Sequence, residues 1–299
     1  MTGQPSATAE PITVAICTFK RVDGLRRTLQ GLWTQQGLPN AGLHVLIVDN
    51  DAAASARQVA ESSQAPLPWS LRYVVESRPG VAAARNRCLT EATTDLLAFI
   101  DDDEVPEPDW LSGLLRWRVQ TAADAVFGPV VPHFEEPPPA WSGHGTVFMR
   151  PRMTSGTRIG WEATRTGNVL FSRHLVELAG GSFDERFATS GGEDLLLFYR
   201  AERSGARFVW CDDAVVHEHL PAGRLRLRWL LRRAFRGGQN WTRVRVDAQP
   251  RAWLPLALRG AAGALAAAAL TVPSLAVSRA AAVRQACRVA GGLGKMTAW

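Results

Sequence analysis

Short apolar runs alternate with helically spaced apolar residues along the first hundred positions. Runs typical of buried strands cover 12–17, 43–48, 71–75 and 96–100. Between them, apolar side chains recur at helical spacing, which predicts helices at 22–36, 52–62 and 81–92. This order of strands and helices predicts an α/β fold with a mainly parallel, Rossmann-like sheet and helices on both faces.

The pattern becomes less regular after the fourth strand. A helix at 109–120 and a strand at 125–131 precede an irregular stretch, 132–160, which is rich in proline and glycine. Short strands are predicted at 167–172, 208–210 and 214–216, and a helix at 191–204. From residue 225 the chain reads as an arginine-rich helix followed by an alanine-rich stretch. We therefore expect a flexible N-terminus (1–10), an α/β domain (11–222) and a C-terminal helical extension (223–299).

Charge divides the chain into two parts. Residues 1–219 hold 20 Lys and Arg against 27 Asp and Glu, whereas residues 220–299 hold 14 against 1. A basic C-terminal region suggests an anionic partner: a diphosphate, an anionic membrane surface or nucleic acid. A solvated basic helix would explain the same charge without a partner. Because no nucleic-acid-binding motif accompanies the basic region, we expect no nucleic-acid partner.

The cysteines and the N-terminus indicate a cellular compartment. The four cysteines are far apart and show no paired metal-ligand spacing, as in a reduced cytosolic protein. The first ten residues are polar and lack the apolar core of a signal peptide. We therefore expect a cytoplasmic protein.

The clearest candidate chemistry is the segment FIDDDEVPEPDW at 99–110, where a predicted buried strand ends at Asp101, Asp102 and Asp103. Three adjacent carboxylates repel one another unless a cation or hydrogen-bond donors compensate. Oxygen ligands suit Mg²⁺ or Mn²⁺. The segment therefore predicts a divalent metal site, whereas an acidic helix cap is the simpler alternative.

Three weaker motifs follow different strands. In GGED, at 191–194, Glu193 and Asp194 begin a predicted helix, and a carboxylate there could act as a general base or simply open the helix. In RPGVAAARNRC, at 78–88, arginine could hold phosphate and asparagine could contact a base or ribose; the residues concerned are Arg78, Arg85 and Asn86. In HEH, at 217–219, two imidazoles could complete a metal shell or be structural.

The ordered set of motifs resembles the family 2 glycosyltransferases, whose fold is called GT-A. The resemblance runs from residue 12 to about residue 241, through VAICTFKR, IVDN, RPGVAAARN, FIDDDEVPEPDWL, GNVLFSR, GGEDLLLFYRA and VVHEHLP. It implies a GT-A catalytic domain at 11–222, with a nucleotide-binding half (11–131) and an acceptor half (132–222). Within the family, the chain looks most like bacterial exopolysaccharide glucosyltransferases of the succinoglycan type.

The resemblance also implies roles for single residues. The nucleotide would be bordered by Thr18, Arg21, Asp49, Arg78, Arg85, Asn86, Asp101, Asp102 and Arg233. Asp103 would be the direct metal ligand, with Asp101 beside it and His219 on the metal side, although His217 is an alternative. Asp194 would be the catalytic base, and Glu193 would support the acceptor pocket.

The implied activity is an inverting transfer of a hexose, with glucose favoured, from a UDP-sugar to an acceptor hydroxyl. The divalent metal would be Mn²⁺ or Mg²⁺, and the acceptor a glycan or lipid-linked oligosaccharide. The uncharged stretch at 260–277 is compatible with peripheral association at the inner face of the plasma membrane, or with ordinary helix packing. Two other classes compete with this interpretation: a metal-dependent phosphohydrolase and a non-catalytic carbohydrate-binding protein.

Overall fold

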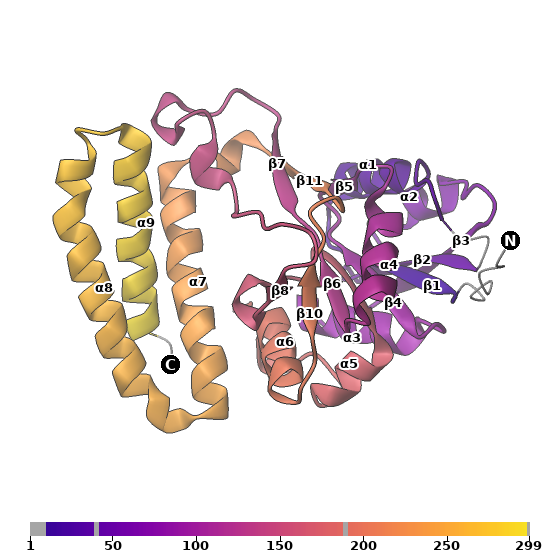
Figure 1. The fold of residues 1–299 in the computed structure, drawn as a ribbon. Helices are drawn as coiled ribbons and strands as arrows, with labels where there is room; N and C mark the ends of the chain where they lie inside the picture. Colours follow the sequence, from indigo (N-terminus) through magenta and orange to yellow (C-terminus); the bar gives the residue numbers. More distant parts are fainter. Residues whose placement is uncertain (1–9, 39–41, 188–190, 298–299) are drawn as a thin grey trace, which may run out of the picture. The chain divides into compact units, whose positions relative to one another are not determined.

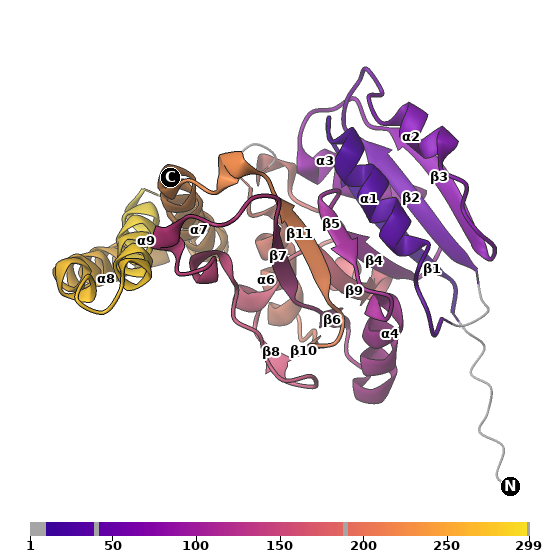
Figure 2. The ribbon, with the colours of Figure 1, turned by 90° about the horizontal axis from the view of Figure 1, so that it is seen from above.

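The computed structural model describes residues 10–38, 42–187 and 191–297. The chain divides into two compact units, which Figure 1 and Figure 2 show from two sides. The first unit comprises residues 1–130, 152–189 and 196–218, and the second comprises residues 131–151, 190–195 and 219–299. The chain thus passes between the units several times, and the domain limits predicted from the sequence stay a prediction. Residues 1–9 of the predicted flexible N-terminus lie outside the described part of the chain.

An eight-stranded sheet forms the centre of the first unit. Its spatial order is β3-β2-β1-β4-β9-β6-β10-β8. The first four strands in this order are parallel, whereas β9 runs antiparallel to both of its neighbours. The strands are β1 (Ile12–Thr18), β2 (Leu43–Asp49), β3 (Trp69–Val75), β4 (Leu96–Ile100), β6 (Ala125–Phe127), β8 (Arg158–Ile159), β9 (Asn168–Ser172) and β10 (Phe208–Trp210). The predicted Rossmann-like, mainly parallel sheet is confirmed.

Helices cover this sheet on both faces. The connections in the order β1-β2-β3 place α1 and α2 on one face, and the return to β4 places α3 on the other (Figure 1). Leu25, Leu29 and Leu32 of α1 are buried in one core with the inward-facing side chains of β1 and β2. The helices are α1 (Val22–Leu32), α2 (Arg57–Ser62), α3 (Val81–Glu91), α4 (Trp110–Thr121), α5 (Arg173–Leu178) and α6 (Glu193–Arg203), the last of which begins in the second unit.

Two of the predicted strands have different limits in the structure. The single strand expected at 125–131 is two strands, β6 and β7 (Val130–Phe134), because Gly128 and Pro129 interrupt the pairing. Pro129 has no N–H to donate, and its carbonyl accepts a bond from the buried amide of Asn168 at 3.0 Å. The strand expected at 214–216 is β11 (Val216–Leu220), which pairs antiparallel with the short β5 (Glu104–Pro106).

Three long helices dominate the second unit: α7 (Leu227–Ala248), α8 (Trp253–Ser274) and α9 (Arg279–Met296). In both ribbon views α9 lies between α8 and α7 (Figures 1 and 2). Part of the predicted irregular stretch, residues 131–151, packs against α9 through two 3-10 turns, Ala140–Ser142 and Thr146–Phe148. A small hydrophobic core lies between this stretch and the helices, and it is made of Phe148, Leu220, Leu225, Leu230 and Val283.

Candidate active site

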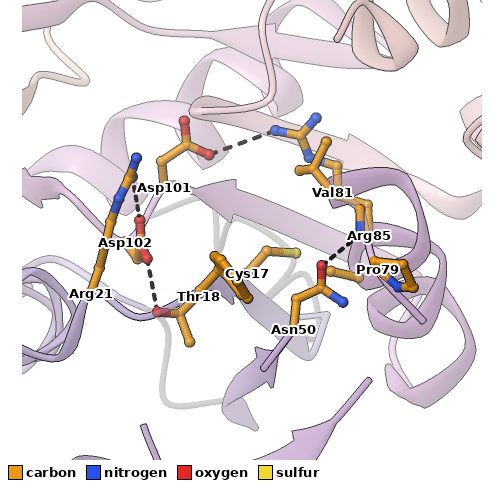
Figure 3. Close-up of a pocket in the computed structure, with 12 residues that line it drawn as sticks. Cys17, Thr18, Arg21, Asn50, Pro79, Val81, Arg85, Asp101 and Asp102 are labelled. Atoms are coloured by element: carbon orange, nitrogen blue, oxygen red, sulfur yellow. Dashed lines mark hydrogen bonds and ion pairs between the residues drawn. The ribbon is translucent and has the colours of Figure 1, made fainter. Parts of the chain in front are cut away.

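A pocket of about 570 Å³ lies at the carboxyl ends of β1, β2 and β4 in the first unit (Figure 3). Parallel sheets place their ligand sites at this edge, since loops from neighbouring strands converge there. The wall combines backbone from the β3–α3 turn with polar side chains from three strand ends. It is lined by Cys17, Thr18, Phe19, Arg21, Asn50, Pro79, Gly80, Val81, Ala84, Arg85, Asp101 and Asp102.

Asp102 is the buried anchor of the acidic segment. The Thr18 hydroxyl donates a hydrogen bond to it at 2.8 Å, and the Arg21 guanidinium donates another at 2.9 Å. Arg21 also donates to Asp103 at 3.0 Å, so one cation bridges two of the three carboxylates. Burial raises the pKa of Asp102, while Arg21 opposes the rise. Asp102 therefore orders the acidic loop and joins it to the end of β1.

Asp101 faces the pocket, and 46% of its side-chain surface is exposed. Its nearest cation is Arg85 of α3, with 3.7 Å between the guanidinium nitrogen and the carboxylate oxygen. Dehydration raises the pKa of Asp101 to about 6, Arg85 lowers it, and Asp103, Asp102 and Glu218 raise it further. A carboxylate held in this surplus of negative charge is suited to contact a bound cation.

Sequence reasoning missed Glu104 and Gly167, which support Asp101 from behind. Glu104 is buried and accepts a hydrogen bond from the Asp101 backbone N–H at 3.1 Å. Burial and the charges of Asp101 and Glu218 raise the pKa of Glu104 well above its usual range. A Cβ at Gly167 would lie 2.6 Å from Glu104 Oε1 and 3.0 Å from Asp101 Oδ2. The glycine of the GNVLFS segment, present in the sequence but not interpreted, was the available signal.

Three residues predicted to border the nucleotide have structural partners and are not among those lining the pocket. Asp49 is fully buried, and its carboxylate accepts bonds from the backbone N–H of Asp51 at 3.0 Å and from the Tyr73 hydroxyl at 2.8 Å. Arg78 pairs with Glu76 and Glu185, and Asn86 binds the backbone of Phe183. Asn50, beside Asp49, lines the pocket instead. The nucleotide roles of Asp49, Arg78 and Asn86 stay predictions.

The GGED segment belongs to the second unit. Gly191 and Gly192 adopt φ angles of 74° and 101°, which side-chain-bearing residues rarely adopt. The Asn240 side chain of α7 packs against this turn, since a Cβ at Gly192 would lie 3.1 Å from it. Glu193 is buried, whereas Asp194 is partly exposed and accepts a bond from the Leu195 N–H at 2.8 Å. The turn thus presents Asp194 at the first turn of α6.

The two histidines of HEH have different surroundings. His217 bonds Glu107 at 2.8 Å, within the first unit. His219 lies in the second unit, where its ring centroid is 4.5 Å from that of His133. The assignment of His219 to the metal side, with His217 as the alternative, stays a prediction. Arg233, predicted to face the diphosphate, lies on α7 above the Trp229 ring at 5.1 Å.

Comparison with known proteins places this geometry in a family. The profile described as "Glycosyl transferase family 2" matches residues 13–176. The chain belongs to the family 2 glycosyltransferases. It is 36% identical over 272 residues to the succinoglycan biosynthesis protein ExoM of Rhizobium meliloti (strain 1021), covering 89% of this chain and 86% of that protein. It is 29% identical over 232 residues to the pre-mycofactocin glycosyltransferase of Mycobacterium tuberculosis, covering 76% of this chain and 46% of that protein.

Solved structures show the same fold. The mannosyltransferase PcManGT from Pyrobaculum calidifontis, in complex with GDP-Man and Mn²⁺, aligns with a TM-score of 0.65 at 22% identity and covers 97% of this chain and 88% of that one. The S. aureus TarS 1-349 structure in complex with UDP-GlcNAc aligns with a TM-score of 0.57 at 14% identity, covering 93% and 89%. The fold of this glycosyltransferase is therefore GT-A, as the sequence motifs predict.

The acidic segment of this glycosyltransferase fits a hard divalent cation. Asp101 and Asp103 offer carboxylate oxygens, and their mutual repulsion is one that a bound cation would relieve. Within the described part of the chain, no three His, Cys, Asp or Glu side chains are already arranged as a metal-ligand set. The set of Asp101, Asp103 and His219 therefore stays a prediction.

Proposed function

We propose that this glycosyltransferase moves a hexose, with glucose favoured, from a UDP-sugar to a hydroxyl of a lipid-linked oligosaccharide in exopolysaccharide synthesis. The pocket that joins Thr18, Arg21, Arg85 and Asp101 at the carboxyl edge of the sheet is the observation that carries the proposal. The similarity to the succinoglycan protein ExoM supports the exopolysaccharide setting. Nucleotide sugars in the related GT-A structures support the class of donor.

The donor would bind in this pocket, which is large enough for part of a nucleotide and carries both signs of charge. Asn50 would shape the wall of the pocket beside the nucleotide, because its side-chain oxygen accepts a hydrogen bond from the Gly80 N–H at 2.9 Å and fixes the β3–α3 turn. Arg85 lies across from Asp101 and can bind a phosphate oxygen. A Mn²⁺ or Mg²⁺ ion held by Asp101 and Asp103 would supply charge neutralisation for the leaving diphosphate.

In the proposed reaction Asp194 accepts the proton of the acceptor hydroxyl as that oxygen attacks the anomeric carbon. The bond from the anomeric carbon to the diphosphate breaks on the opposite face, so the configuration inverts. Glu193, buried beside Asp194, would support the acceptor pocket. Asp194→Asn should lower turnover by roughly 10²–10⁴-fold while leaving UDP binding unchanged, since the amide cannot accept the proton. Wild-type turnover in this variant would remove Asp194 from the mechanism.

A lipid-linked acceptor would place the protein at the inner face of the plasma membrane, as a peripheral cytoplasmic protein. The strongly basic C-terminal region supports this location, because the cytoplasmic leaflet is anionic.

Titration calorimetry with UDP, with and without Mn²⁺, tests the donor site. We expect metal-dependent binding that weakens at least about tenfold in Asp101→Asn, because one carboxylate ligand is lost. The matched control is Asp213→Asn, which removes an exposed carboxylate paired with Arg116 outside the pocket. Equal binding by the three proteins would contradict the proposed site.

A transfer assay then separates the proposed enzyme from the alternatives. Wild-type protein is incubated with UDP-glucose, Mn²⁺ and a lipid-linked oligosaccharide acceptor, and the product is analysed by mass spectrometry. A glycosylated acceptor supports the proposal. Release of glucose that is unchanged by acceptor, with no glycosylated product, would favour a hydrolase instead.

A further inference from the structure

Helix α8 exposes an apolar stripe that the fold of the second unit leaves uncovered. Leu254, Leu258, Leu265 and Val272 recur at intervals of four and seven residues, so they share one side of the helix. Each is between 57% and 73% exposed. No charged residue occurs from 260 to 278. A contiguous exposed apolar face of this kind usually marks a surface that is covered in the working protein.

The other side of α8 is fixed to α9. Leu256, Gly260, Ala264 and Ala267 are buried, and the two backbones come so close at Gly260 that a Cβ there would lie 2.7 Å from the carbonyl of Gly292. Glycine at both positions permits this approach. Any environment that α8 enters must therefore also accommodate α9.

Charge along α9 decides between spanning a membrane and lying on it. Within the described residues, the stretch Pro250–Ser274 is long and apolar enough to cross a bilayer, with a mean hydropathy of 1.5. However, α9 carries Arg284, Arg288 and Lys295 along its length. Each would reduce insertion into hydrocarbon by about a hundredfold. The packed pair of helices therefore suits an interface rather than a span.

The positive charge lies beside the apolar stripe but not within it. By helical spacing, Arg259 and Gly263 stand on the side of α8 away from Leu254 and Val272. Arg259, Arg288 and Lys295 line a cleft of about 430 Å³, and none of its described lining residues is acidic. The Lys295 ammonium lies 4.4 Å from the centre of the Trp241 ring. An apolar face with a basic opposite face is the arrangement of a helix that lies in a membrane surface.

We infer that α8 docks this protein on an anionic lipid bilayer, with the α8 stripe among the acyl chains nearest the headgroups and the basic residues of α8 and α9 facing lipid phosphates. Charge opposes pairing of α8 with the same region of a second copy, since residues 220–299 hold 14 basic residues and 1 acidic residue and would repel their like, whereas an anionic bilayer attracts them. This inference rests on the membrane location in the proposed function. It does not depend on the donor site.

Sedimentation of the full chain with lipid vesicles tests the inference. The vesicles contain either phosphatidylcholine alone or a mixture with phosphatidylglycerol. We expect binding to the anionic vesicles that weakens as salt is raised, because part of the attraction is electrostatic. Leu265→Gln should weaken the binding about tenfold, since a leucine side chain no longer leaves water. Arg288→Gln should weaken it about fivefold at low salt.

Val119→Gln is the matched control, because Val119 of α4 is 77% exposed and Leu265 is 73% exposed. It should bind vesicles like the wild type. The affinity of Leu265→Gln for UDP in the presence of Mn²⁺ should equal that of the wild type. Failure of the proposed donor site and failure of the proposed membrane surface therefore give different results.

Three results would overturn the inference. The first is that wild-type protein binds neither kind of vesicle, or that Leu265→Gln and Val119→Gln weaken vesicle binding equally. The second is a wild-type dimer in solution that Leu265→Gln converts to a monomer, which would make a second copy the occupant. The third is wild-type protein that alkaline carbonate fails to extract from membranes, which would show that α8 spans them.

Discussion

Gly167→Ala tests whether the backbone behind Asp101 positions the acidic site. An added Cβ would lie 2.6 Å from Glu104 Oε1, whereas ordinary contacts begin at 3.4 Å. Gly167 does not adopt a positive φ, so alanine fits its backbone and the effect is purely steric. The two groups must separate by about 0.8 Å, and overpacking of this kind costs ~1–3 kcal/mol of folding stability.

The same displacement should reach the pocket. Glu104 accepts the Asp101 N–H, and the new methyl group would also press on Asp101 Oδ2 at 3.0 Å. A shift approaching 1 Å in a group that positions substrate reduces turnover by about ten- to a hundredfold. We therefore expect Gly167→Ala to lower both the free energy of unfolding in urea and the rate of sugar transfer.

Two further variants make the Gly167→Ala test specific. Gly263→Ala is the control, because a Cβ at this helical glycine meets no atom within 4 Å, and it should retain stability and transfer activity. Glu104→Asp withdraws the buried carboxylate by one methylene, so it should recover part of the loss when combined with Gly167→Ala. Wild-type stability and turnover in Gly167→Ala would refute the reasoning, and so would strictly additive effects in the double variant.

Three other predictions concern the first unit. Asp184 binds Arg186 and Arg200, and the hydrogen bonds from Arg186 lower the pKa of Asp184 to about 2. Its contribution to folding stability is complete above the ordinary aspartate pKa and is lost as the pH falls through the lowered value. In urea unfolding, wild type but not Asp184→Asn should therefore lose ~1–2 kcal/mol between about pH 4 and pH 2, and parallel plots of stability against pH for the two proteins would contradict this. Cys17 lines the pocket, whereas Cys287 lies in the second unit, and both are free thiols. UDP with Mn²⁺ should slow the labelling of Cys17 by maleimide and leave that of Cys287 unchanged, as followed by mass spectrometry. An unchanged rate at Cys17 would place the nucleotide elsewhere. Asn168 accepts a hydrogen bond from the Trp110 indole at 2.8 Å and donates to the carbonyls of Pro129 and Ala214. Asn168→Ala leaves these buried partners without the amide, so it should lower the free energy of unfolding by ~2–4 kcal/mol. A smaller loss would mean that water replaces the amide.

The position of a site residue at a strand end could be predicted from the sequence, whereas the direction of its side chain could not. Thr18, Arg21, Arg85, Asp101 and Asp102 meet at one pocket, as expected from residues that follow neighbouring parallel strands. Asp49 follows such a strand too, yet its carboxylate binds the loop that follows β2. The strand end fixes where a residue lies, but not whether its side chain turns toward the pocket or the chain behind it.

Much of this protein was determined by the sequence alone. Alternating apolar runs predicted the parallel sheet, because strand and helix periodicities are local properties of the chain. The acidic segment, the ordered motifs and the basic C-terminal region could also be identified from the sequence, since each consists of residues that are neighbours in the chain. Tertiary structure alone decided the rest. The roles of Asp101 and Asp102 diverge because Thr18, 84 residues from Asp102, binds one of them and leaves the other open to the pocket. The support of Asp101 by Glu104 and Gly167, and the pairing of α8 with α9 that leaves one stripe exposed, likewise depend on contacts between residues distant in the chain, which no local pattern encodes.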